Sequence, residues 1–117
     1  MKILSAHHQE PTFTPDVFVA EIDGAKARSL RAFYTRIAKV LHFPNYFGKN
    51  LDAMFDCLCS LEAVGKQEVV LLIRNYDFFL EKEKSASLEA CLKVFRDAEL
   101  PENRTDGVVF RAIGLKL

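Results

Sequence analysis

Five consecutive apolar residues, Val69 to Ile73, constrain the fold of this 117-residue chain more than any other feature. A continuous apolar run of this length is typical of a β-strand that is covered on both faces. Two further β-prone segments, residues 17–22 and 108–113, lie before and after it. Stretches with helical periodicity separate the three segments, which predicts a parallel sheet with right-handed crossovers.

The stretches between the predicted strands contain helix signals. Ser29 and Asn50 are good N-caps, because each is followed by apolar residues at helical spacing. A short helix is expected at residues 75–80, and a longer one at residues 88–98 that Pro101 ends. We therefore predict an α/β fold: a small three-stranded parallel sheet with about four packed helices.

Length and charge limit the class of protein. A chain of 117 residues favours one domain, which we place at residues 17–117, after an irregular N-terminal arm at residues 1–16. The formal net charge is zero, so nothing general indicates binding to nucleic acid or to an anionic membrane. No apolar run approaches the length of a membrane span, and the N-terminal one is too short for a signal peptide. We expect a cytoplasmic protein.

The three cysteines fit that expectation. Cys57, Cys59 and Cys91 are odd in number, and none has metal-site spacing with a histidine. Reduced thiols are therefore expected, with Cys91 in the core, and no metal site is predicted.

Residues 44–58 contain the strongest functional signal. Asp52 and Asp56 lie four residues apart on a predicted helix, away from its apolar stripe, where like charges repel. A cost to stability of this kind often marks a functional site. Tyr46 and Phe47 precede Gly48, where a positive φ is expected. An acidic patch beside aromatic rings is the composition of a protein–protein hot spot.

This segment closely resembles that of barstar-type ribonuclease inhibitors. It contains the pattern Pro-x-Tyr-aromatic-Gly-x-Asn-Leu-Asp-Ala, followed by aromatic-Asp-Cys-Leu, and a second match lies at residues 94–98. The resemblance covers roughly residues 17–115. It implies a three-stranded parallel sheet with helices packed around it. It also implies a one-to-one, immunity-type inhibitor of a bacterial ribonuclease toxin, with no cofactor and no enzymatic activity.

The resemblance further implies which residues contact a cationic ribonuclease, either barnase-like or another toxin nuclease. Asp56 matches the aspartate that enters the phosphate-binding pocket of the enzyme, and Asp52 matches a second acidic contact. Tyr46 matches an aromatic side chain that lies against a catalytic histidine. Asp97 stands where glutamate is usual, and Phe55 stands where tryptophan is found. The full set of implied contacts is Tyr46, Phe47, Gly48, Asn50, Asp52, Phe55, Asp56 and Asp97.

Two other functions stay open at this point. The chain could be a barstar-like module that binds a partner other than a ribonuclease. It could also be a hydrolase that uses Asp52 and Asp56 as a carboxylate pair, although no motif supplies a cleft, a metal ligand or a nucleophile triad. From pattern alone, exposed carboxylates on a helix are solvated as often as they bind a partner.

Overall fold

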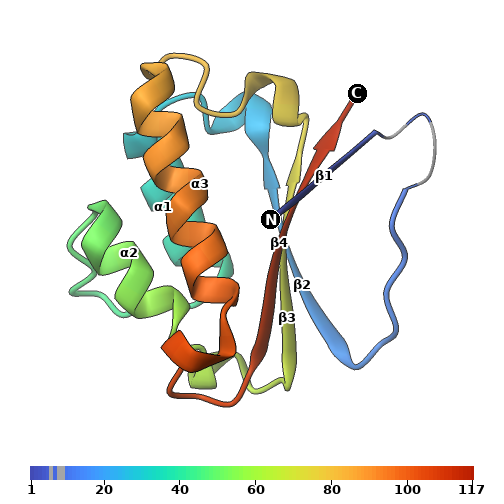
Figure 1. The fold of residues 1–117 in the computed structure, drawn as a ribbon, viewed down its shortest axis with the longest axis vertical. Coiled ribbons are helices and arrows are strands. Elements are labelled where there is room, and N and C mark those ends of the chain that lie inside the picture. The colour runs from blue at the N-terminus through green and yellow to red at the C-terminus, as the bar shows by residue number, and fades with distance from the viewer. Residues whose placement is uncertain (6, 8–9) are drawn as a thin grey trace.

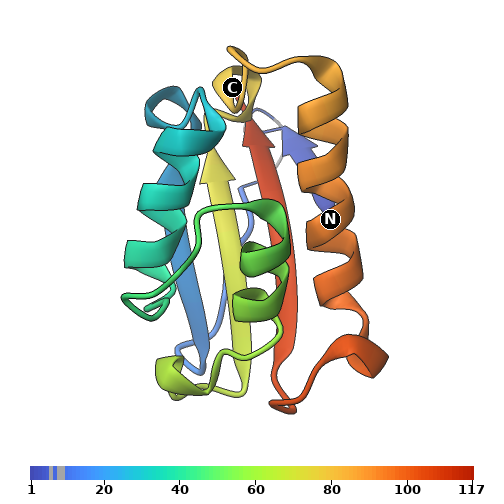
Figure 2. The same ribbon diagram turned by 90° about the vertical axis from the view of Figure 1, so that its left-hand side faces the viewer.

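A single parallel sheet organises the described residues, 1–5, 7 and 10–117, in the computed structural model. Its strands lie in the order β1-β4-β3-β2. The strands are β1 (Lys2–Ser5), β2 (Val17–Asp23), β3 (Glu68–Arg74) and β4 (Val109–Lys116). The α-helices are α1 (Leu30–Val40), α2 (Leu51–Leu58) and α3 (Ser85–Glu99). All three helices cover the same face of the sheet (Figures 1 and 2).

The α/β class and the three predicted strands are confirmed, but two details were wrong. Residues 2–5 of the expected arm form a fourth strand, β1, which pairs in parallel with β4 from Lys2 opposite Ile113 to Ser5 opposite Lys116. The expected short helix at residues 75–80 is only a 3-10 turn, Tyr76–Phe78. Asn75 has a φ of 51° and Phe79 is extended, so neither end can continue an α-helix.

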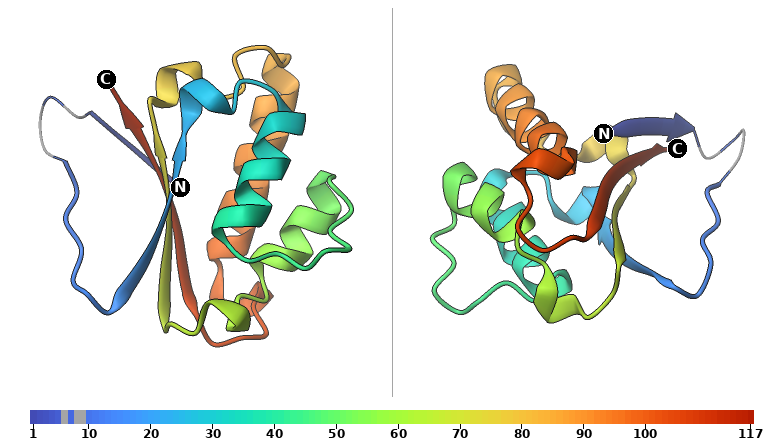
Figure 3. Two further views of the ribbon diagram at one scale, coloured as in Figure 1. Left: turned by 180° about the vertical axis from the view of Figure 1, so that it is seen from behind. Right: turned by 60° about the horizontal axis from the view of Figure 1, so that its bottom comes forward.

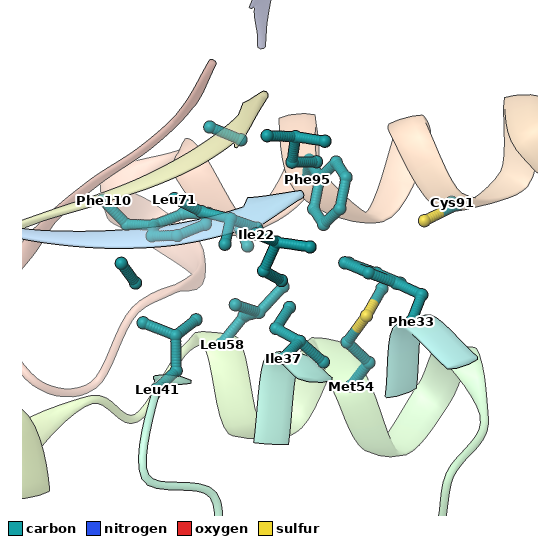
Figure 4. Packing of buried hydrophobic residues seen from close by; sticks show 14 of the residues in the cluster. Ile22, Phe33, Ile37, Leu41, Met54, Leu58, Leu71, Cys91, Phe95 and Phe110 are labelled. Atoms are coloured by element: carbon teal, nitrogen blue, oxygen red, sulfur yellow. The ribbon is translucent and has the colours of Figure 1, made fainter. Parts of the chain in front are cut away.

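The two faces of β3 are buried under different parts of the chain. Val69, Leu71 and Ile73 face the helices and are fully buried in the main core, which Figure 4 shows from close by. Val70 and Leu72 lie on the other face, where Phe13 packs against their cluster. The segment that precedes β2 passes on this side of the sheet, as Figure 3 shows from behind (left) and from below (right). Burial on both faces explains the continuous apolar run.

The helix signals in the sequence are confirmed at the atomic level. The side chain of Ser29 accepts a hydrogen bond from the Ala32 N–H at 3.2 Å, and that of Asn50 accepts one from the Ala53 N–H at 2.8 Å. The longest helix, α3, ends at Glu99, two residues before Pro101. Among the described residues, no helix is both long and apolar enough to cross a bilayer.

Candidate functional site

Helix α2 fixes the two carboxylates in place. Met54 and Leu58 are fully buried beneath the helix, and Leu51 and Phe55 are half-buried at its margins. Figure 4 shows Met54 and Leu58 pointing into the core beside Ile37 of α1. Asp52 and Asp56 are exposed on the outer side. Because one side of α2 is anchored in the core, the helix presents both carboxylates from a rigid support.

The turn before α2 differs from the expectation in one respect. Gly48 does not have a positive φ; the positive φ falls on Lys49, at 50°. A Cβ atom on Gly48 would lie 3.2 Å from Asn50 Nδ2 and 3.4 Å from the Ala53 Cβ. Gly48 therefore gives room for the close approach of the N-cap side chain, which also donates from Nδ2 to the Gly48 carbonyl at 3.3 Å. Asn50 is placed as a helix cap.

The neighbouring aromatic residues of the loop point to opposite environments. The Tyr46 side chain is exposed, with 87% of its surface accessible, whereas Phe47 is only 8% accessible. The Phe47 ring packs edge-on against Phe43 at 5.1 Å and against Tyr34 at 6.0 Å, measured between ring centres. Phe47 therefore anchors the loop in the core, and Tyr46 is the aromatic ring that the loop leaves exposed.

A groove of about 380 Å³ lies between α2 and α3. Asp97 on α3 lines this groove together with Asp52 and Asp56 on α2. Lys93 also lines this groove, and its Nζ donates to Asp97 Oδ2 at 2.7 Å. Sequence reasoning named Asp97 but missed Lys93. The spacing of four residues between them on one helix was the available signal.

A second groove, of about 470 Å³, lies on the other side of Asp56, toward the loop. Tyr46, Cys57 and Glu62 contribute to its lining. Glu62 begins the 3-10 turn Glu62–Val64, and its carboxylate accepts from the Ser60 hydroxyl at 2.8 Å. No motif pointed to Glu62, because its place beside Asp56 depends on the turn that follows α2. Burial, and then the negative charge of Asp56, raise the pKa of Cys57, which keeps it a neutral thiol.

The family model described as Barstar (barnase inhibitor) matches residues 17–113. This chain belongs to the barstar family. Its similarity to one curated relative is 32% identity over 57 residues; that relative is the Bacillus subtilis (strain 168) protein named "Putative ribonuclease inhibitor YrdF". The match covers 49% of this chain and 59% of the relative. The barstar-family region begins at the first residue of β2, so β1 and residues 10–16, which precede β2, lie outside it.

Proposed function

We propose that this barstar-family protein inhibits a ribonuclease by binding it one to one and covering its active site with α2 and the loop before it. One observation carries the proposal: Tyr46, Asp52 and Asp56 are exposed together beside a helix whose inner side is buried. A carboxylate at this place can imitate a phosphate, because it can accept paired hydrogen bonds from the arginines of a phosphate-binding pocket. The rigid support lowers the entropy cost of binding.

The proposal includes the setting in which such an inhibitor acts. The partner is a cationic toxin nuclease, barnase-like or of another type, and the inhibitor works as a bacterial immunity protein in the cytoplasm. Inhibition by occlusion needs no cofactor and no catalytic group of the inhibitor. Asp97, Phe55 and the loop residues Phe47, Gly48 and Asn50 belong to the proposed surface as contacts or as its support.

The charge distribution predicts how this inhibitor finds its partner. The chain is neutral overall, yet three aspartates line one groove. The basic residues Arg31, Arg36 and Lys39 line a separate groove on α1, which shares no lining residue with those beside α2. Local attraction at α2 therefore acts without long-range attraction from the whole molecule. Association should slow as salt rises, but less steeply than for a strongly acidic inhibitor.

Titration into a candidate cationic ribonuclease tests the proposal. RNA cleavage should vanish near one equivalent, and a mononucleotide should compete with the inhibitor. Asp56→Ala should weaken the inhibition, whereas the matched control Asp16→Ala, outside both grooves, should not. Simultaneous tight binding of inhibitor and mononucleotide would rule out occlusion of the active site. Hydrolysis by the chain alone would instead support the carboxylate-pair enzyme.

A further inference from the structure

The two grooves beside Asp56 differ in where their charges lie. On the α3 side, Asp52, Asp56 and Asp97 line the groove together with Lys93. On the loop side, the acidic residues are Asp56 and Glu62, and the described residues that line this groove include His42 but no lysine or arginine. Among the described lining residues, a cationic group of a partner therefore meets a lysine on one side of Asp56 only, the side of α3.

Lys93, the basic residue of the groove beside α3, is held in place by an ion pair. Lys93 Nζ lies 2.7 Å from Asp97 Oδ2, one helical turn along α3, while 69% of the Lys93 side-chain surface stays accessible. The pair balances the charge of Asp97. The carboxylate of Glu62 is oriented differently, by the neutral Ser60 hydroxyl at 2.8 Å, and so keeps its full charge for a ligand. Among the ion pairs of the described residues, Asp97 is thus the one acidic side chain around Asp56 that is already neutralised within the chain.

This inference rests on the proposed function. We propose that Lys93 is a specificity-determining residue, which holds Asp97 in an internal ion pair and directs the partner's cation to the loop side of Asp56, where Glu62 is the second acidic contact. A partner that places a cation against α3 is repelled by Lys93. A partner that places a carbonyl or carboxylate there is accepted, because Lys93 can donate a hydrogen bond to it.

Association rates with the inhibited ribonuclease test the role of Lys93. Lys93→Gln and the control Lys82→Gln remove the same charge, and Lys82 is an exposed residue that lines neither groove. At low salt, Lys93→Gln should raise the association rate constant by about two- to five-fold, the range typical of an exposed charge pair, and Lys82→Gln should raise it less. Equal rates for the two variants would overturn the role of Lys93.

A double-mutant cycle separates an internal ion pair from a direct contact. Asp97→Asn in the wild-type background should slow association, because it leaves Lys93 as an unbalanced cation. At high salt, where long-range attraction is screened, the same change in the Lys93→Gln background should leave the affinity nearly unchanged, whereas Glu62→Gln should still weaken binding. A full effect of Asp97→Asn in that background would show that Asp97 itself binds the nuclease, and would overturn the inference.

The same set of variants distinguishes failure of the proposed inhibition from failure of the proposed role of Lys93. Inhibition by the wild-type chain and its competition with a mononucleotide report on occlusion of the active site, whichever side of Asp56 the cation enters. The ranking of Glu62→Gln against Asp97→Asn reports only on the side of entry. Thermal melts of all variants exclude unfolding as the cause of any change.

Discussion

Arg104 and Asp106 form a two-point ion pair that is buried beneath the end of α2. Arg104 Nη2 lies 2.7 Å from Asp106 Oδ2, Nε lies 3.1 Å from Oδ1, and the two side chains are 3% and 0% accessible. Asp106 also accepts from the Leu61 N–H, just after α2, and Arg104 donates from Nη1 to the Ala98 carbonyl near the end of α3. The pair therefore ties together the two helices that form the acidic groove.

Breaking this pair should destabilise the fold strongly. Asp106→Asn leaves the Arg104 guanidinium buried beside a neutral partner, and loss of one member of a buried pair costs about 3–5 kcal/mol. Urea unfolding of the variant measures the loss. Glu102→Gln, which removes an exposed carboxylate nearby, should change the free energy of unfolding by less than about 0.5 kcal/mol. Similar midpoints for the two variants would contradict a structural role for the pair.

The same carboxylate should make the fold sensitive to acid. Burial raises the pKa of Asp106, but hydrogen bonds from Arg104 and from the Leu61 and Val108 N–H groups, with the positive charge of Arg104, outweigh burial and hold the pKa below its usual value of 3.8. The unfolded chain therefore binds this proton at a higher pH than the folded chain. The stabilisation is complete above the usual pKa and is lost as the pH falls through the lowered one.

Asp23 adds to this acid sensitivity, because hydrogen bonds from the Asn75 amide and from the Ala25 N–H lower its pKa as well. Urea unfolding at several pH values between 6 and about 2.5 should show a constant free energy of unfolding at the upper end and a fall below about pH 4. Asp106→Asn should reduce the slope of that fall. An unchanged slope in the variant would show that other carboxylates cause it.

The main core could be predicted from the sequence because its signals are local. The apolar stripe of α2 and the caps Ser29 and Asn50 depend on neighbours within a few residues, and all are found as expected. The strand β1 could not be predicted, since Lys2–Ser5 is short and gains its place only by pairing with β4 at the far end of the chain. Phe13, in the expected arm, is partly buried only because the sheet provides a second apolar face.

The candidate site shows the same division. Asp52, Asp56 and Tyr46 could be named from one continuous segment that matches a family pattern. Lys93 and Glu62 lie beside them only after α3 and the turn after α2 are packed. The sequence did not reveal the pair of Arg104 and Asp106. Its other partners are backbone groups, the Leu61 N–H and the Ala98 carbonyl, which carry no signal in the residue pattern.

The cysteines should differ in reactivity according to their burial. Burial raises the pKa of Cys91 to about 12, and this residue is fully buried on α3. Iodoacetamide at pH 8 should leave Cys91 unmodified in the folded protein and should modify the half-buried Cys57 before Cys59. In guanidinium chloride all three should react, as mass spectrometry of the peptides would show. Fast modification of Cys91 in the folded chain would contradict its placement.

Tyr46 and Phe47 should respond in opposite ways to substitution. Phe47→Ala removes a buried ring and should lower the free energy of unfolding by about 3 kcal/mol, while Tyr46→Ala should change it by less than about 0.5 kcal/mol. The order should be reversed for nuclease binding: Tyr46→Ala should reduce the affinity of the folded molecules more than Phe47→Ala does. Melts and binding titrations of both variants check this. Equal destabilisation by the two changes would show that the loop is anchored by both rings.

Asp56→Ala should cause the largest loss of nuclease binding among the acidic residues, because it leaves cations of the partner desolvated without an anion. Hot-spot truncations cost roughly 2 kcal/mol or more, and the upper end of that range is a value for barstar itself. Asp52→Ala and Tyr46→Ala should cost less, and Asp97→Ala least, since Lys93 already balances that charge. Binding titrations of the four variants against one nuclease check this order.

The fold should tolerate Asp56→Ala. The change removes the repulsion with Asp52 at four residues' distance, and it removes a negative charge from the last turn of α2, where the helix dipole disfavours it. The melting temperature should stay unchanged or rise slightly. Binding titrations and melts of the same preparations decide between contact and support. A sharply lowered melting temperature, with full affinity in the molecules that remain folded, would make Asp56 a structural residue and remove it from the proposed surface.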